Sequence, residues 1–141
     1  MINLKNTVES LNVMGKGNMS EHLGVEFLEI TESSITARMP VDHRTKQPMG
    51  LLHGGASVVL AETLGSVGAY SCIDTEKQYC VGLEINANHI RAVREGYVYG
   101  KASFIHLGRK TQIWEIRITN EKKQLVCISR LTVAVLDKDQ A

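Results

Sequence analysis

One acidic residue stands inside an otherwise uncharged stretch of the chain. Between Leu51 and Cys72, Glu62 is the only residue with a formal charge, and no Lys or Arg lies there to pair with it. A carboxylate among apolar side chains costs free energy unless it is paired or has a chemical task. Glu62 is therefore a candidate general base toward water or a nucleophile toward an acyl carbon. A structural carboxylate bonded to nearby N–H or hydroxyl groups is the alternative.

A glycine pair precedes this carboxylate at the expected start of a helix. Gly54 and Gly55 come just before Ala56–Ala69, whose length and apolar content are typical of a buried helix. The first turn of a helix presents unpaired backbone N–H groups and the positive end of the helix dipole. A ligand could come against this backbone, which could hold a carbonyl oxygen that becomes an oxyanion during acyl transfer. On spacing alone, glycines that only serve the turn are an equal alternative.

Two further polar residues extend this candidate site. Ser66 lies four residues after Glu62 and therefore on the same helix face. His53 could act as an acid, a base, a donor that orients a ligand, or an ordinary helix-entry residue. The other histidines lack metal-ligand spacing such as HxxxH, and the chain has no GxSxG and no Walker-type phosphate loop. We therefore expect no metal site and no serine nucleophile.

Two groups of basic residues flank the strands predicted after the helix. They are His89, Arg91 and Arg94, after the first of these strands, and His106, Arg109 and Lys110, around the next turn. Such residues could bind a phosphate-bearing ligand tail. The alternative is a solvated set of strand ends, and without a fold the residues favour that alternative.

The composition is that of one globular domain over residues 1–141. Hydrophobic residues make up 43% of the chain and charged residues 22%, which excludes a disordered or fibrous protein. The net charge of +1 gives no reason to expect nucleic acid or an anionic membrane as a partner. Scattered cysteines without CxxC spacing indicate reduced thiols, and the N-terminus has no signal pattern, so we expect a cytoplasmic protein.

The order of predicted elements gives an α+β fold. Hydrophobic periodicity predicts a weak helix, two strands, one long helix and four strands: Asn3–Met14, Val25–Ile30, Ser34–Met39, Ala56–Ala69, Cys80–Ala92, Tyr97–Leu107, Thr111–Thr119 and Leu125–Leu136. Strands linked by hairpins are antiparallel and need one face covered, so we expect a curved antiparallel sheet wrapped around the long helix. The exposed edges of a single sheet favour a dimer.

Two details of the pattern make sharper predictions. Apolar residues on nearly every face of the long helix predict that protein surrounds it. Its row of small residues, Ala61, Gly65 and Ala69, predicts the close approach of another backbone. Strict alternation in the following strand predicts one face with Val81, Leu83, Ile85 and Ala87, and an opposite face with Gly82.

The stretch QPMGLLHGG, followed by ASVVLAETLGS, resembles the hot-dog-fold acyl-CoA thioesterases of the 4-hydroxybenzoyl-CoA and phenylacetate-pathway type. The shared pattern is Q-P-x-G-x-x-H-G-G with an acid eight residues after the first paired glycine. The resemblance continues through VGLEINANHIRAVREG and HLGRK to SRLTVAVL. GLEINANH in particular is similar to the branch that hydrolyses 1,4-dihydroxy-2-naphthoyl-CoA in menaquinone synthesis.

This resemblance implies a hot-dog fold paired into dimers and then tetramers, with each active site at a dimer interface. It implies hydrolysis of an acyl-CoA thioester, an aromatic one before a long alkyl one, without metal or bound cofactor. Glu62 would be the catalytic carboxylate of one subunit, as nucleophile or general base. The other subunit would contribute Gln47, His53 and the N–H of Gly54, while Ser66 would place water or substrate. The residues implied to hold coenzyme A are Gly82, His89, Arg91, His106 and Arg109.

Three other functions stay open at this point. One is a proofreading thioesterase that acts on an aryl-loaded carrier protein, a sister branch that shares the HGG region. Another is a hot-dog dehydratase or hydratase acting on a β-hydroxyacyl thioester, which the intact Q-P-x-G-x-x-H-G-G context disfavours. The third is a non-enzymatic acyl-CoA binder. The joint presence of Gln47, His53 and Glu62 disfavours it, because a binder needs no carboxylate beside the thioester.

Overall fold

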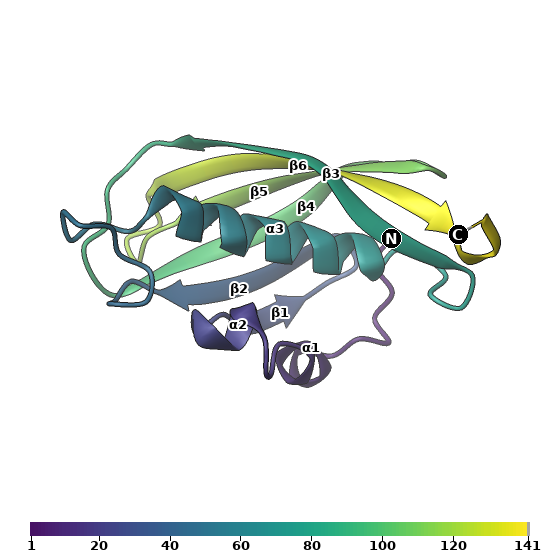
Figure 1. Ribbon diagram of the computed structural model, residues 1–141, viewed down its shortest axis with the longest axis horizontal. Helices are drawn as coiled ribbons and strands as arrows, with labels where there is room; N and C mark the ends of the chain where they lie inside the picture. Colours follow the sequence, from purple (N-terminus) through teal and green to yellow (C-terminus); the bar gives the residue numbers. More distant parts are fainter. Residues whose placement is uncertain (141) are drawn as a thin grey trace.

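A six-stranded antiparallel sheet with one long helix across its face makes up the fold (Figure 1). The computed structural model describes residues 1–140. Its elements are α1 (Val8–Met14), α2 (Met19–His22), β1 (Glu26–Ile30), β2 (Ser34–Pro40), α3 (Gly54–Tyr70), β3 (Gln78–His89), β4 (Tyr97–Leu107), β5 (Thr111–Thr119), β6 (Leu125–Asp137) and η1 (Lys138–Gln140). The strand order is β1-β2-β4-β5-β6-β3. This is the α+β hot-dog architecture that the sequence predicts.

Helix α3 packs one face on the sheet and leaves the other half-buried. Leu60 and Leu64 are fully buried, and they fill the space that the missing side chain of Gly100 leaves on β4. Val58, Val59 and the rest of the opposite face keep intermediate exposure. The prediction that protein surrounds this helix is therefore wrong for a single copy of the chain.

The small residues of α3 make room for large side chains rather than for another backbone. A Cβ at Gly65 would lie 2.6 Å from Leu131 of β6, and one at Gly68 would lie 2.7 Å from the ring of Trp114 on β5. Trp114 is fully buried, meets Phe104 edge to face, and donates its indole N–H to Gln112 at 3.0 Å. Side chains of β5 and β6 thus fill the space beside the small residues of α3.

A bulge in β3 changes which residues face α3. The register against β6 shifts between Gly82 and Glu84, so Leu83 is the extra residue. Because the bulge resets the alternation, Gly82 faces the helix on one side of it and Ile85 on the other. Strict alternation placed Gly82 away from the Ile85 face, and that prediction is wrong. It also ran the strand to Ala92, whereas β3 ends at His89.

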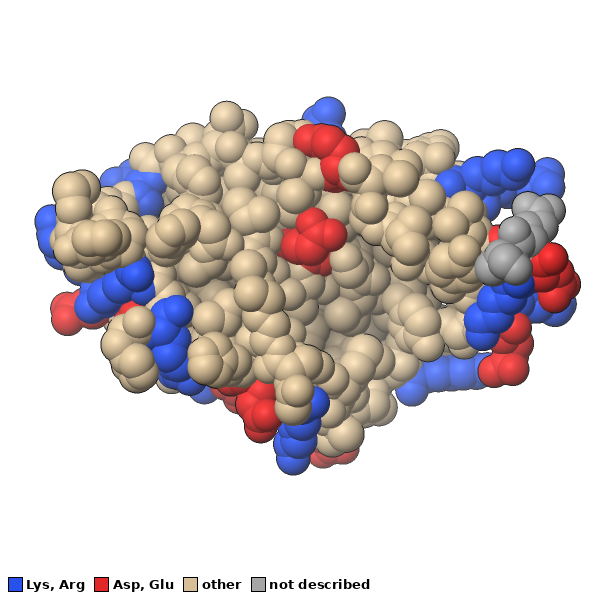
Figure 2. All heavy atoms as spheres, in the orientation of Figure 1, with Lys and Arg blue, Asp and Glu red and all other residues tan. Residues whose placement is uncertain are grey.

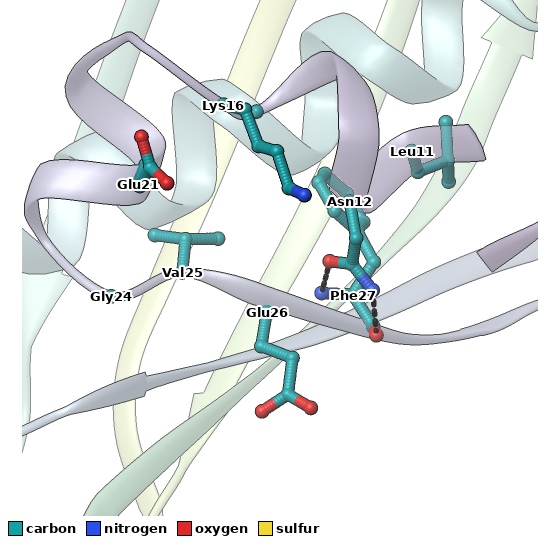
Figure 3. A pocket seen from close by; sticks show the side chains of 9 residues that line it. Leu11, Asn12, Lys16, Glu21, Gly24, Val25, Glu26 and Phe27 are labelled. Carbon is teal, nitrogen blue, oxygen red and sulfur yellow. Dashed lines mark hydrogen bonds between the residues drawn. The ribbon is translucent and has the colours of Figure 1, made fainter. Parts of the chain in front are cut away.

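The β1 edge of the sheet is closed by α1. The side chain of Asn12 accepts from the backbone N–H of Phe27 at 2.8 Å and donates to its carbonyl at 3.1 Å (Figure 3). An asparagine thereby takes the place that a further strand would occupy. The helix begins at Val8 rather than Asn3, because Thr7 and Ser10 form a capping box there.

The β3 edge is open. β3 stands at the end of the sheet, with Val81 40% and Leu83 62% exposed. Neither α3 nor β3 contains a Lys or Arg. Figure 2 shows the side of the molecule on which α3 and β3 lie, with few charged side chains at its centre and most of the basic ones toward the periphery.

Within residues 1–140, no helix combines the length and apolarity that a membrane span requires.

Candidate active site

The N-terminus of α3 has one free backbone donor. The N–H of Gly55 donates to Nδ1 of His53 at 2.7 Å, and those of Ala56 and Ser57 both donate to the His53 carbonyl. The N–H of Gly54 has no acceptor among residues 1–140. Because the helix dipole places its positive end here, this group is suited to bind an oxygen that gains negative charge.

Two side chains near this N–H each keep a hydrogen-bond donor that has no partner in the described chain. Nδ1 of His53 accepts a hydrogen bond, so the neutral ring carries its proton on Nε2 and can donate it outward. The side-chain oxygen of Gln47 accepts from the N–H of Met49, which leaves the amide NH₂ of Gln47 available. The start of α3 is thus a cluster of hydrogen-bond donors.

A cavity of about 360 Å³ opens at this helix start. It brings together four residues predicted for the site: Gln47, Gly54, His89 and Arg91. The ring of His89 lies so close that a Cβ at Gly54 would stand 2.8 Å from its Nε2. A side chain at this position would have to displace the exposed His89 ring, so the glycine lets the ring lie close to the start of α3.

Glu62 lies further along α3, against β3. A Cβ at Gly82 would lie 2.7 Å from Oε1 of Glu62, so the absence of a side chain on β3 gives the carboxylate its place. Within the described chain, this carboxylate has no ion pair and no side-chain hydrogen bond. Burial raises the pKa of Glu62, because leaving water penalises the charged form. Ser66 follows on the same face and, with Gly82, lines a hollow of about 230 Å³.

One copy of the chain does not bring Glu62 to the Gly54 cavity. The two residues are eight positions apart on one helix, which corresponds to about 12 Å along its axis. Glu62 does not line that cavity. A carbonyl group bound at the Gly54 N–H is therefore out of reach of the carboxylate of the same chain.

The last two predicted residues lie elsewhere. Arg109 lines a third hollow together with Gln78, the first residue of β3, whereas His89 is the last. Since a strand rises about 3.3 Å per residue, the two ends of β3 are on the order of 35 Å apart. His106, near the end of β4, lies next to Gly108 in the turn that also contains Arg109. Within one copy, His106 and Arg109 thus do not share a site with His89 and Arg91.

Sequence reasoning missed one polar residue of the Gly54 cavity, Ser57. It is 2% exposed and lines the cavity beside Gly54. The available signal was a polar residue three positions after Gly54, at the spacing that places both on one helix face.

Residues 49–127 match the family model of the thioesterase superfamily. The chain belongs to that superfamily. It is 57% identical to 1,4-dihydroxy-2-naphthoyl-CoA hydrolase of Escherichia coli, over 94% of this chain and 96% of that protein. It is 50% identical to the proofreading thioesterase of Cronobacter turicensis, over 92% and 94%. A mutant thioesterase from Pseudomonas aeruginosa has the same fold, with a TM-score of 0.92, 52% identity and coverage of 94% and 95%.

Membership in this superfamily makes the chain a thioester hydrolase of the hot-dog class. The matched segment includes the whole of α3, with the free N–H of Gly54 and the carboxylate of Glu62. The dehydratase and the acyl-CoA binder that the sequence left open are thereby disfavoured. The similar identities to two kinds of thioesterase leave the acyl group and its carrier to be argued from the site.

Proposed function

We propose that this chain hydrolyses aromatic acyl-CoA thioesters at a site shared by two copies of the chain. The observation that carries the proposal is Glu62, a carboxylate without a counter-charge that lies against a glycine on a half-buried helix face. Its raised pKa fits a group that takes up a proton during the reaction. The 57% identity to a 1,4-dihydroxy-2-naphthoyl-CoA hydrolase makes that aroyl group the first candidate.

The substrate carbonyl binds at the start of α3. The free N–H of Gly54 and the positive end of the dipole stabilise its oxygen as negative charge develops. Nε2–H of His53 and the amide of Gln47 supply further donors beside it. Their hydrogen bonds fix the direction of the carbonyl and draw electrons from the acyl carbon.

Glu62 of the second copy reaches the acyl carbon. It either attacks that carbon, giving an anhydride that water opens, or takes a proton from water that attacks instead. Both routes break the C–S bond, add the oxygen of water to the acyl group and return a proton to the coenzyme A thiolate. Ser66 on the same helix face places the water or the substrate.

The open edge of β3 supports this two-copy arrangement. Pairing of β3 with a second β3 would extend the sheet and cover Val81, Leu83 and the half-buried face of α3. It would also bring the two α3 helices together, which supplies the carboxylate that one copy lacks at the Gly54 cavity. A further pairing of dimers into a tetramer is part of the proposal.

Coenzyme A extends from this site toward basic residues. Arg91 and His89 line the Gly54 cavity and are suited to bind phosphate oxygens. His106 and Arg109 lie far from that cavity in one copy, so they would reach the nucleotide only from another copy. Gly82 borders the thioester through its contact with Glu62.

The deciding experiment is free-thiol release from a panel of thioesters by the wild type and Glu62→Gln. The panel contains 1,4-dihydroxy-2-naphthoyl-CoA, benzoyl-CoA, a medium-chain acyl-CoA and an aryl-loaded carrier protein. Removing a general base lowers kcat by roughly 10²- to 10⁴-fold, so the variant should lose nearly all turnover while it still binds substrate. Equal turnover of both proteins would exclude Glu62 as the catalytic group.

A second candidate is the proofreading reaction on a carrier protein, which the 50% identity to such an enzyme favours. Both reactions use the same acyl chemistry and differ in what holds the pantetheine arm. A higher kcat/KM for the aryl-loaded carrier protein than for the corresponding aroyl-CoA would decide for the proofreading function.

A further inference from the structure

Ser57 is the only buried hydroxyl residue of α3, and its hydroxyl differs from those of the partly buried Thr63 and of Ser71, which follows the helix. Thr63 donates to the Val59 carbonyl at 2.7 Å, and Ser71 donates to the Val67 carbonyl at 2.8 Å. Such bonds to the preceding turn are the ordinary way to satisfy a hydroxyl in a helix. The hydroxyl of Ser57 has no side-chain hydrogen bond within residues 1–140, although the residue is only 2% exposed.

The position of this hydroxyl follows from the surrounding packing. Among the described residues, no fully buried polar side-chain atom lacks a partner. The Oγ of Ser57 therefore keeps contact with the open space of the cavity that the residue lines. Side chains in a helix lean toward its N-terminus, so the Ser57 hydroxyl leans toward the turn that begins at Gly54. One wall of the cavity thus carries two unpaired donors, this hydroxyl and the Gly54 N–H.

The rest of the cavity makes this placement selective. Leu52, Ile90 and Val126 contribute apolar surface around the two donors. A hydroxyl in apolar surroundings gains most from a ligand that supplies a hydrogen-bond partner and loses most from one that does not. The free hydroxyl is therefore better suited to recognise an acyl group than to support the fold.

We propose that Ser57 contacts the substrate and hydrogen-bonds an oxygen atom at or next to the reacting carbonyl. This inference rests on the proposed aroyl-thioester hydrolysis and assigns it a further residue. Two substrate oxygens have the required chemistry. One is the thioester carbonyl oxygen itself, and the other is a hydroxyl on the ring carbon next to the one that bears the carbonyl, as in the 1,4-dihydroxy-2-naphthoyl group.

The test compares Ser57→Ala with the wild type on 2-hydroxybenzoyl-CoA and benzoyl-CoA, with kcat and KM measured by free-thiol release. Ser71→Ala is the matched control, since Ser71 is equally buried at the C-terminal cap of the same helix but its hydroxyl is bonded. Loss of one hydrogen bond to the substrate lowers kcat/KM by about tenfold. Ser57→Ala should leave Tm unchanged, because no internal bond is lost, whereas Ser71→Ala should lower Tm and leave the preference between the two substrates unchanged.

Each outcome has one meaning. A loss confined to 2-hydroxybenzoyl-CoA identifies the ring hydroxyl as the partner of Ser57, and an equal loss on both thioesters identifies the carbonyl oxygen. Unchanged kcat/KM on both substrates, or a fall in the Tm of Ser57→Ala like that of Ser71→Ala, overturns the assignment. A wild-type protein that hydrolyses neither these thioesters nor the wider panel instead contradicts the proposed function, whatever Ser57 does.

Discussion

The two edges of the sheet differ in how they are covered: α1 covers the β1 edge, and the β3 edge is open. β1 has five residues and lies under α1, where Asn12 occupies both backbone groups of Phe27. β3 has 12 residues, carries the exposed Leu83 at its bulge and has no strand of the described chain on the side away from β6. Long apolar edges attract other strands, and proteins usually protect them. The chain protects the edge far from Glu62 and leaves open the edge that lies against it.

This difference connects assembly with chemistry. Glu62 lies against β3 at Gly82, so a second copy that paired with β3 would come near the carboxylate. Under the proposed function, the open edge is the means by which one copy obtains the Gly54 cavity of another. Under the same proposal, the sealed edge limits strand pairing to the β3 side.

The largest effect is expected from a charge on the open edge. Leu83→Asp should keep two copies apart, because like charges meet when two β3 strands pair, and should therefore abolish both assembly and turnover. Molar mass from light scattering, measured together with thiol release, checks this. Leu28→Asp places the same charge on an exposed leucine of β1 and should change neither. Wild-type mass and turnover in Leu83→Asp would show that β3 is not the interface.

A smaller effect is expected at the sealed edge. Asn12→Ala removes both hydrogen bonds to Phe27 and should lower the free energy of unfolding by about 1–3 kcal/mol, with turnover unchanged. Urea unfolding measures the difference. The control is Asn88→Ala, which alters an exposed asparagine of the open edge and should leave stability unchanged. If Asn12→Ala is as stable as the wild type, the pairing with Phe27 contributes nothing to the β1 edge.

The smallest effect is a gain in stability from Glu62→Gln. Burial raises the pKa of Glu62 above its ordinary value of 4.5, so the folded chain binds this proton more tightly than the unfolded chain does. The charged carboxylate therefore begins to cost stability as the pH rises through 4.5 toward the raised value, and the cost persists at neutral pH. Glu62→Gln should raise Tm slightly at pH 7 and leave it unchanged in acid.

Thermal melting at both pH values measures this, with Glu84→Gln on the exposed part of β3 as the control that should not shift. A lower Tm of Glu62→Gln at pH 7 would mean that the carboxylate stabilises the fold. In that case the open edge would lie beside a structural group rather than a reactive one.

Local patterns predicted the architecture well. β4 and β5 have the predicted bounds, because the turn residues Glu95, Gly96 and Gly108 separate these strands from their neighbours. The spacing of Gly54 and Glu62 likewise pointed to α3, the element to which we assign the chemistry in the proposed function. Both features depend only on the order of residues that are close together in the sequence.

Long-range arrangements were beyond the sequence. The bulge at Leu83 depends on how β3 pairs with β6, and only that pairing reveals that Gly82 faces Glu62. Asn12 hydrogen-bonds the backbone of Phe27, and no periodicity in the sequence relates these two residues. Whether a hydroxyl such as that of Ser57 finds a partner is likewise decided by packing, so its type and position alone could not mark it.

Trp114 gives the molecule a reporter of its own. It is the chain's only tryptophan, fully buried where β5 meets Gly68 of α3. Its fluorescence should therefore report whether α3 is packed on the sheet. Trp114 itself lies away from the open edge of β3. Dissociation of two intact copies should leave the emission unchanged, whereas release of α3 should shift it to longer wavelengths. A single optical signal can thus distinguish separation of the copies from unfolding of either one.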